Sequence, residues 1–448
     1  MKLDRRSFVR CASLAAAGNV VGLRPFGAMN ALAQSGTGYQ ALVCIFMYGG
    51  NDSNNTIIPF DTAGYSNYSS IRGPLALPQS SLLQLGPSPN FALHPSLPDI
   101  QTMYANGTAA IVTNVGTLVQ PLTKALYQGG ATPTPENLFS HPDQQMEWQN
   151  ASQTGSVPTG WAGRMADSLS PVYNPNATVP MITSLYGDTL FCNGATTAPA
   201  AVTAGNIQGG QCSIGAKPCP GRLETAQQIV TFSSGVSLVQ ADNEITSAAY
   251  NNMAVLSSAL QSGTTLKTQF PANNSLAAQL QQIAQIIQVR SVLGVGRQIF
   301  FAGLGNFDTH ANQLGTQSTL LSLVSPAMAA FYQATIELGL AKQVTTFTMS
   351  DFSRAFQPNS NNGSDHAWGG HHIVMGGAVQ GGQMYGTFPT LALGGPNDSD
   401  INGRWIPTTA SVQYAATLAS WFGVPSGSLS TIFPNIGSFA TAKLGFLG

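Results

Sequence analysis

The chain has six histidines, and three of them stand together in Ser364–His372. A fourth, His310, follows Asp308 by two residues, and Asp351 and Asp365 lie in the same third of the sequence. Charged residues make up only 8% of the chain, so these acids are a concentrated set. Histidine and aspartate bind hard and borderline metal ions and transfer protons. Their grouping in a chain so poor in charge indicates a metal or catalytic site.

Three apolar runs of strand length each lead to an acid. The runs are residues 41–48, 298–304 and 344–349, and the acids that follow are Asp52, Asp308 and Asp351. Runs that are apolar on both faces are typical of central strands in a parallel sheet, where sites form beyond the carboxyl ends. We therefore expect the three acids to form the floor of one site. For Asp52 taken alone, a turn residue that caps the next segment is an equal alternative.

The sequence spacing of the histidines indicates which of them could share one site. Alternate side chains of an extended segment share one side, so Asp308 and His310 could bind the same ion. His371 and His372 are adjacent and would face opposite ways, so only one of them could share a site with His366. We favour His366 first and His371 second, and we place His372 outside the direct contacts.

The stretch Ser140-His141-Pro142-Asp143 predicts the start of a helix, with Ser140 as the N-cap. In a functional interpretation, the helix N-terminus would stabilise an attacking alkoxide or an anionic substrate. Ser140 would then be a nucleophile, and His141 its neighbouring base or a ligand. Arg354 could bind an oxygen of a tetrahedral anion, or form a salt bridge with a nearby aspartate.

The N-terminus predicts export. Asp4-Arg5-Arg6-Ser7-Phe8, an apolar run to Leu23 and Ala31-Leu32-Ala33 are typical of a twin-arginine signal peptide, residues 1–33. An ordinary secretory leader with two arginines is the alternative. The apolar run is shorter than the roughly 20 residues that span a bilayer. We expect residues 34–448 to form a single domain, periplasmic or secreted, with no transmembrane segment in the mature chain.

Charge and cysteine content agree with this. The net charge is −1 and no basic run occurs, so we expect no nucleic-acid partner. Cys212 and Cys219 flank a short loop that a disulfide could close in an oxidising compartment. Cys44 lies inside an apolar run and is expected to be a buried free thiol.

The remaining elements define the fold class. Strands are expected at residues 109–115 and 373–379, and helices at 273–293, 321–340 and 411–422. With 48 Gly and 27 Pro, many connections should be long loops. The pattern predicts an α/β fold with a mostly parallel central sheet and helices on both faces.

Taken in order, these motifs resemble a bacterial family of exported proteins, "domain of unknown function 1501", which is itself similar to the alkaline phosphatase and sulfatase superfamily. The resemblance rests on the leader, Gly49–Asp52, Ser140-His141, Asp308–His310, Asp351–Arg354 and the segment from Asp365 to Gly377. It implies an alkaline-phosphatase-like fold with metal ions at the carboxyl ends of the sheet. It also implies Ser140 as candidate nucleophile, and it implies the candidate ligands Asp52, Asp308, His310, Asp351, His366 and His371.

The chain also departs from the superfamily pattern. The superfamily usually spaces one Asp and His four apart, whereas here the spacing is two and Asn312 holds the expected place. Phe352 follows Asp351 where a histidine is usual. No Cys or Ser precedes x-Pro-x-Arg at the nucleophile, which disfavours a formylglycine sulfatase.

The leading hypothesis is an exported metal-dependent hydrolase of phosphate, sulfate or related esters, acting on a small anionic ester or a glycan. Zinc is the first choice of divalent metal, with manganese and calcium as alternatives. The rival hypothesis is a non-catalytic metal- or glycan-binding protein of the cell envelope on the same fold. Phe352 and the altered spacing favour the rival, whereas Asp52, Ser140 and His366 favour the enzyme.

Overall fold

The computed structural model describes residues 38–86, 90–152, 157–205, 213–214, 217–218, 222–231 and 235–448. The predicted signal peptide and the two cysteines of the predicted disulfide, Cys212 and Cys219, lie outside the described residues. Cys44 and Cys192 are buried free thiols, which confirms the prediction for Cys44.

Strand β1 (Gln40–Met47) runs through the middle of the central sheet, parallel to β10 (Arg297–Leu304) on one side and β11 (Val344–Ser350) on the other. Alternate β1 residues enter two separate cores. Ala41, Val43, Ile45 and Met47 pack on one face, and Leu42, Cys44 and Phe46 pack on the opposite face. Burial on both faces explains why the run is continuously apolar.

The sheet has the order β13-β5-β12-β11-β1-β10-β6-β7, and β14 also pairs with β5. The further strands are β5 (Ala109–Gly116), β6 (Ile182–Ser184), β7 (Ala200–Ala201), β12 (Gly370–Met375), β13 (Met384–Tyr385) and β14 (Thr409–Ala410). Only β12 runs against its neighbours β11 and β5; the other pairings are parallel. The predicted mostly parallel sheet is confirmed.

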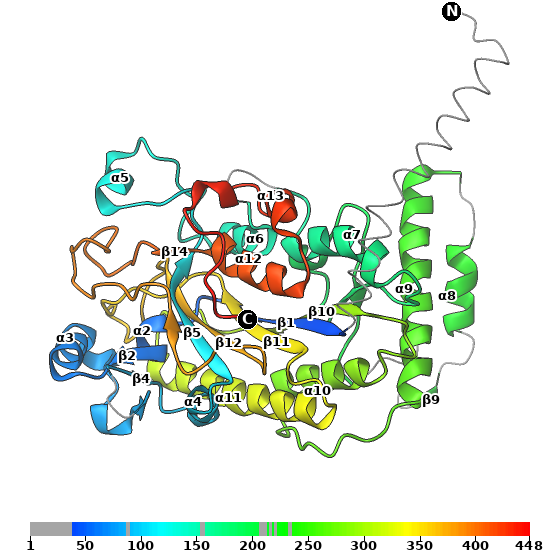
Figure 1. The fold of residues 1–448 in the computed structure, drawn as a ribbon, viewed down its shortest axis with the longest axis horizontal. Helices are drawn as coiled ribbons and strands as arrows, with labels where there is room; N and C mark the ends of the chain where they lie inside the picture. The colour runs from blue at the N-terminus through cyan, green and yellow to red at the C-terminus, as the bar shows by residue number, and fades with distance from the viewer. Residues whose placement is uncertain are drawn as a thin grey trace, which may run out of the picture.

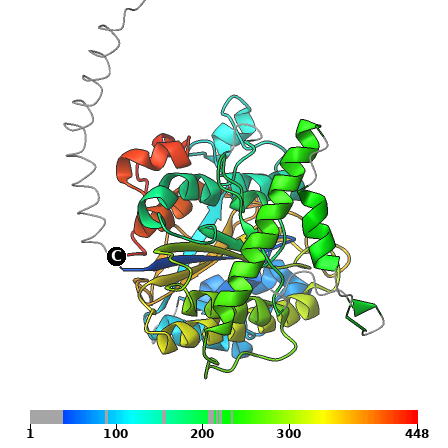
Figure 2. The same cartoon turned by 90° about the vertical axis from the view of Figure 1, so that its right-hand side faces the viewer.

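Helices cover both faces of the sheet, as Figures 1 and 2 show. One face carries α4 (Pro98–Ala105), α10 (Ser275–Gln288) and α11 (Gln313–Glu337). The other carries α6 (His141–Asn150), α7 (Trp161–Tyr173), α12 (Ser411–Phe422) and α13 (Leu429–Ile432). The predicted α/β architecture with three layers is therefore confirmed.

Smaller elements surround these layers. They are α2 (Ser53–Thr56), α3 (Thr62–Arg72), α5 (Lys124–Gly129), α8 (Arg222–Val230), α9 (Ser237–Gln261), the three-stranded sheet of β2 (Ile57–Pro59), β4 (Phe91–Leu93) and β3 (Leu83–Gln84), and the hairpin of β8 (Ser213–Ile214) and β9 (Lys217–Pro218). Helices α8 and α9 lie at the β7 end of the sheet (Figure 1).

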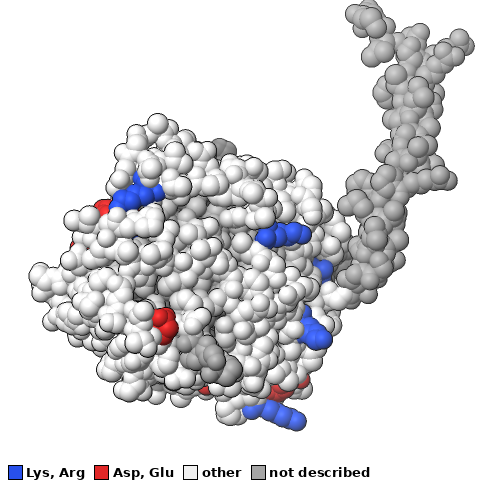
Figure 3. All heavy atoms as spheres, turned by 60° about the vertical axis from the view of Figure 1, so that its left-hand side comes forward, with Lys and Arg blue, Asp and Glu red and all other residues white. Residues whose placement is uncertain are grey.

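Helix α11 begins earlier than predicted, at Gln313, and continues through Pro326. In the described part of the chain it is the one helix long and apolar enough to cross a membrane by length and composition. Its most apolar window is 56% buried, and the helix packs on α10 and α4. Charged side chains are sparse on the surface, as the mostly white face in Figure 3 shows.

Strand β12 also begins earlier than predicted, so both His371 and His372 lie within it. His371 is buried, its Nδ1 accepts a hydrogen bond from the Asn114 main-chain N–H (3.0 Å), and its ring stacks on Phe388. His372 points to the opposite face and packs on Trp148. The two rings face opposite ways as expected, but His371 is held by β5 and Phe388, so the expectation that it shares a site with His366 is not met.

Burial lowers the pKa of both His371 and His372 from 6.5 to about 3. Between these values the unfolded chain binds more protons than the folded chain, so the free energy of unfolding falls as the pH falls. We expect a loss on the order of 1 kcal/mol per pH unit for each histidine. The variant His372→Phe keeps an aromatic ring against Trp148 and removes one titrating group. Urea unfolding at a series of pH values should give it a shallower pH dependence; a slope equal to that of the unmodified protein would contradict this.

Candidate metal centre at the carboxyl edge of the sheet

Four separate segments bring the candidate residues to one edge. Asp308 and His310 lie in the loop between β10 and α11, and Asp351 directly follows β11. His141 is the first residue of α6. His366 precedes β12, and because β12 is antiparallel to β11, its beginning lies at the carboxyl edge of the parallel strands.

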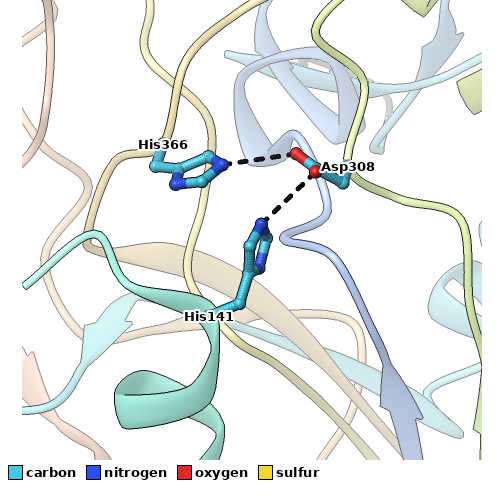
Figure 4. Close-up of side chains that lie close together, drawn as sticks. All are labelled: His141, Asp308 and His366. Atoms are coloured by element: carbon cyan, nitrogen blue, oxygen red, sulfur yellow. Dashed lines mark hydrogen bonds and ion pairs between the residues drawn. The ribbon is translucent and has the colours of Figure 1, made fainter.

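His141, Asp308 and His366 converge, with one ligand atom of each within 4.8 Å of the others (Figure 4). The His141 Nε2 atom lies 3.4 Å from Asp308 Oδ2, and His366 Nε2 lies 3.3 Å from Asp308 Oδ1. His310 joins them, with its Nε2 atom 3.0 Å from Asp308 Oδ1 and 2.9 Å from His366 Nε2. Three imidazole nitrogens therefore face one carboxylate. We call these four residues the His–Asp cluster.

Asp351 orients His141. Its Oδ2 atom lies 2.7 Å from His141 Nδ1 and also accepts from Gln145 Nε2 (2.7 Å), while its Oδ1 accepts from the Gly49 N–H (3.0 Å). Asp351 has no exposed surface, and its Oδ2 lies where it accepts from a His141 ring that carries its proton on Nδ1. The Nε2 lone pair then points to Asp308, and this buried nitrogen has no hydrogen-bond partner.

A main-chain carbonyl orients His366, and His310 lies near a second acid. His366 Nδ1 donates to the Phe139 carbonyl oxygen (2.6 Å), which leaves its Nε2 unprotonated in the neutral ring. His310 Nδ1 lies 3.4 Å from Asp365 Oδ1. Phe139 has a left-handed main chain (φ 73°), an uncommon conformation for a bulky residue that turns its carbonyl toward the imidazole.

The charges of the cluster follow from its neighbours. The hydrogen bond and charge of Asp351 raise the pKa of His141, whereas burial lowers the pKa of His366. Burial alone would raise the pKa of Asp308, but the hydrogen bond and charge of Arg354 lower it. Asp308 is thus ionised and His366 neutral at neutral pH.

Asp308 and the imidazole nitrogens that face it therefore form a compact set of potential metal ligands, in which His310 Nε2 and His366 Nε2 share a hydrogen bond. Nitrogen and oxygen ligands at roughly 2.0–2.1 Å in a tetrahedral zinc site lie ~3.3 Å from one another. The distances of 2.9 to 3.4 Å within the His–Asp cluster agree with this spacing. His141, Asp308 and His366, whose ligand atoms lie within 4.8 Å of one another, form a group that could hold a metal ion, and His310 lies beside it.

Gly49 lets the loops approach closely enough to form the cluster. Its φ is +112°, and a Cβ atom at this position would lie 2.4 Å from Asp308 N. The same two loops are also joined by a hydrogen bond from the Phe307 N–H to the Tyr48 carbonyl oxygen (3.0 Å). A side chain at position 49 would displace Asp308.

Ser140 heads α6 as predicted, but its hydroxyl does not cap the main chain. It donates instead to Asp143, and this hydrogen bond lowers the pKa of Asp143. His141, the next residue, reaches the cluster. Of the two side chains, the structure places His141 in the site and turns Ser140 to its own helix.

Arg354 is completely buried, and both of its terminal nitrogens donate to the chain, whereas its buried Nε has no hydrogen-bond partner. Its Nη1 donates to Asp308 Oδ1 (2.8 Å) and to the Gly49 carbonyl (3.3 Å), and its Nη2 donates to the Ser364 carbonyl. The salt-bridge interpretation of Arg354 is the one that the structure supports.

Asp52 does not join the His–Asp cluster. It is buried, its Oδ2 accepts from Arg72 and Gln313, and its Oδ1 accepts from Asn54 N (3.0 Å) as the N-cap of α2. The expected floor of three acids is thus reduced to Asp308 and Asp351, because Arg72 and Gln313 occupy the carboxylate of Asp52. Arg72 is distant in sequence, and nothing in its surroundings identified it as the partner.

Sequence reasoning also missed Gln145 and Phe139, which orient Asp351 and His366. Gln145 follows His141 by one helical turn and therefore projects from the same side of α6, a spacing that could have indicated it. The Phe139 contribution is a main-chain carbonyl, for which side-chain identity carries no signal.

Residues 39–399 match the family described as "Protein of unknown function (DUF1501)", and the chain belongs to this family. No curated protein matches the sequence.

Solved structures with a similar fold are members of the alkaline phosphatase and sulfatase superfamily. The lipoteichoic acid synthase LtaP from Listeria monocytogenes is 7% identical, with a TM-score of 0.36 over 88% of this chain and 74% of that chain. A protein of the alkaline phosphatase superfamily from Vibrio parahaemolyticus is 11% identical, with a TM-score of 0.33 over 86% and 67%. Ps i-CgsB in complex with k-i-k-neocarrahexaose is 8% identical, with a TM-score of 0.36 over 89% and 77%. Similarities of this size concern the course of the main chain, and the chemistry of the site follows from its own side chains.

The variant Asp308→Asn tests the cluster as a metal site. It removes the charge that faces three imidazole nitrogens, so we expect zinc affinity to fall at least about tenfold, or roughly 1.4 kcal/mol. Zinc content by elemental analysis and affinity by competition with a chelator measure the effect. Asp188→Asn, which changes an exposed loop acid that contacts Asn193, is the matched control and should bind as the unmodified protein does. Unchanged affinity in Asp308→Asn would exclude the site.

The variant Asp351→Asn tests orientation rather than direct contact. Loss of the carboxylate releases the His141 tautomer, so we expect zinc affinity to fall roughly 10–100-fold. Asp365→Asn should have a smaller effect, because Asp365 is 54% exposed and lies 3.4 Å from His310. Equal losses in the two variants would show that burial of the orienting acid is unimportant.

Proposed function

We propose that this protein is an exported, metal-dependent hydrolase of phosphate, sulfate or related esters. The supporting observation is the convergence of the oriented imidazoles of His141 and His366 on Asp308, with His310 beside them. Zinc is the proposed ion, because a set of imidazole nitrogens with one carboxylate suits zinc, and manganese is second. Calcium, which prefers oxygen ligands, suits the nitrogen-rich set less well.

His141, His366, His310 and Asp308 would hold the ion. When bound, such an ion supplies Lewis-acid polarisation of the ester and activation of a nucleophile. The chain's own residues provide the orientation: Asp351 keeps the His141 proton on Nδ1, and the Phe139 carbonyl keeps the His366 proton on Nδ1. Exposed fractions of 43% for Asp308 and 45% for His310 leave the cluster accessible to a substrate.

Ser140 is the proposed nucleophile of a covalent route. It lies next to His141 and at the N-terminus of α6, where main-chain donors favour negative charge. Its hydroxyl must first leave Asp143. The leader at residues 1–33 is the basis for proposing periplasmic or secreted location, with residues 34–448 as a single mature domain.

A second candidate function is a non-catalytic metal- or glycan-binding protein of the cell envelope. The observation that favours it is that two of the expected catalytic residues, Ser140 and Arg354, already form hydrogen bonds within the chain. Ser140 donates to Asp143, a weak base because its pKa is lowered, and the buried Arg354 is bound by the chain. A protein of this kind would retain the His–Asp cluster and lack turnover.

An assay of the purified mature protein separates the two functions. With zinc or manganese added, we expect hydrolysis of a nitrophenyl phosphate, phosphodiester or sulfate. Ser140→Ala should lower kcat by at least about 100-fold, the size of the effect of a nucleophile or positioned proton donor, with metal content unchanged. Turnover retained in Ser140→Ala would assign the attack to water. No turnover with any ester or ion, despite bound metal, would favour the binding protein.

A further inference from the structure

The proposed substrates are anionic, yet the two buried arginines near the His–Asp cluster and the half-buried Lys124 are already engaged. Arg354 is bound as described above, and Arg72 donates to Asp52, Asn55 and two main-chain carbonyls. Lys124 Nζ donates to the carbonyls of Gly394 (2.8 Å) and Asp400 (3.1 Å). None of these three groups is available to an anion without breaking internal bonds.

Arg404 differs from them. Its side chain is 25% exposed, and its Nε donates to the His366 carbonyl oxygen (2.9 Å). Its Nη1 donates to Asp400 Oδ2 (2.9 Å), and its Nη2 has no hydrogen-bond partner among the described residues. The partly exposed guanidinium therefore keeps one nitrogen without a partner and is bonded to the main chain of a cluster histidine.

Phe139 fixes the direction of this guanidinium. The Arg404 Cζ atom lies 4.9 Å from the centroid of the Phe139 ring, and the Phe139 carbonyl accepts from His366 Nδ1 (2.6 Å). Arg404 and the His366 imidazole are thus held by the same residue, one through its ring and the other through its main chain. A stacked guanidinium has few rotamers to lose when it binds a ligand.

We propose that Arg404 is the residue that binds the charged oxygens of a tetrahedral anion, phosphate or sulfate, at this site. This inference rests on the proposed function, and it transfers to Arg404 the role that the sequence suggested for Arg354. The planar guanidinium forms paired hydrogen bonds with two oxygens of such an anion. The Nη1 donor of that fork already donates to Asp400, whose carboxylate is an anionic acceptor of the kind that Arg404 would bind.

The test measures anion binding directly, separately from turnover. Titration calorimetry with inorganic sulfate and inorganic phosphate is performed on the mature protein, both metal-free and zinc-loaded, at low ionic strength. We expect the unmodified protein to bind at least one of the two anions and Arg404→Gln to bind it at least about tenfold more weakly, as for loss of one charged hydrogen-bond pair. Arg404→Lys, which keeps the charge but not the fork, should give an intermediate affinity.

Arg290→Gln is the matched control. Arg290 also stacks on an aromatic ring, that of Tyr39 (5.4 Å), and also donates to a main-chain carbonyl, that of Ile287. It lies between α10 and the start of β10, at the opposite edge of the sheet. This variant should bind the anions as the unmodified protein does. Asp400→Asn should bind them equally or more tightly, because it removes a competing carboxylate.

Absence of binding of both anions to the unmodified protein, or equal binding by Arg404→Gln, would overturn the inference. So would a loss in Arg404→Gln that is matched by a loss of zinc, because Arg404 would then act by positioning His366. Anion binding through Arg404 in a protein that holds no metal and hydrolyses no ester would leave the inference standing and refute the hydrolase.

Discussion

The contact between Asp351 and His141 joins the sheet to the site. Asp351 comes directly after β11, accepts from the Gly49 main chain after β1, and meets the first residue of α6 on the other side. A carboxylate without exposed surface is costly to bury unless several donors surround it. The donors here are two side chains and one main-chain N–H. The hydrogen bonds from these three donors set the relative positions of β1, β11 and α6, and with them the direction of the His141 side chain.

Three acids near this edge have assigned donor partners; Asp52 and Asp351 are buried, and Asp308 is 43% exposed. Asp52 has Arg72 and Gln313, Asp351 has His141 and Gln145, and Asp308 has Arg354. In the first two cases donors and acceptors balance. At Asp308 they do not, because three imidazole nitrogens also converge there and at least two of them present lone pairs. The His–Asp cluster therefore gathers several potential ligand atoms around one carboxylate, as expected of a site for a cation.

Much of the fold was predictable because burial on both faces leaves a strong pattern. β1, β10 and β11 coincide with continuous apolar runs, and the acids after β10 and β11 meet at the carboxyl edge. The position of Asp52 and His371 outside the His–Asp cluster was not predictable in this way. Each belongs to a contact between segments far apart in sequence, Gln313 with Asp52 and Asn114 with His371, and local spacing does not report such contacts.

The sequence by itself determined the strands, the edge at which polar residues gather, and the family, since these follow from hydrophobic period and from short motifs. Only the tertiary structure decided which polar groups remain free. Asp308, His310, His141 and His366 share a centre because β12 is antiparallel and Gly49 admits the loop after β10. Arg354 and Asp52 are not available to a ligand because neighbouring chain segments already form hydrogen bonds with them. Whether a side chain is available depends on every donor and acceptor within reach, and that set exists only once the chain has folded.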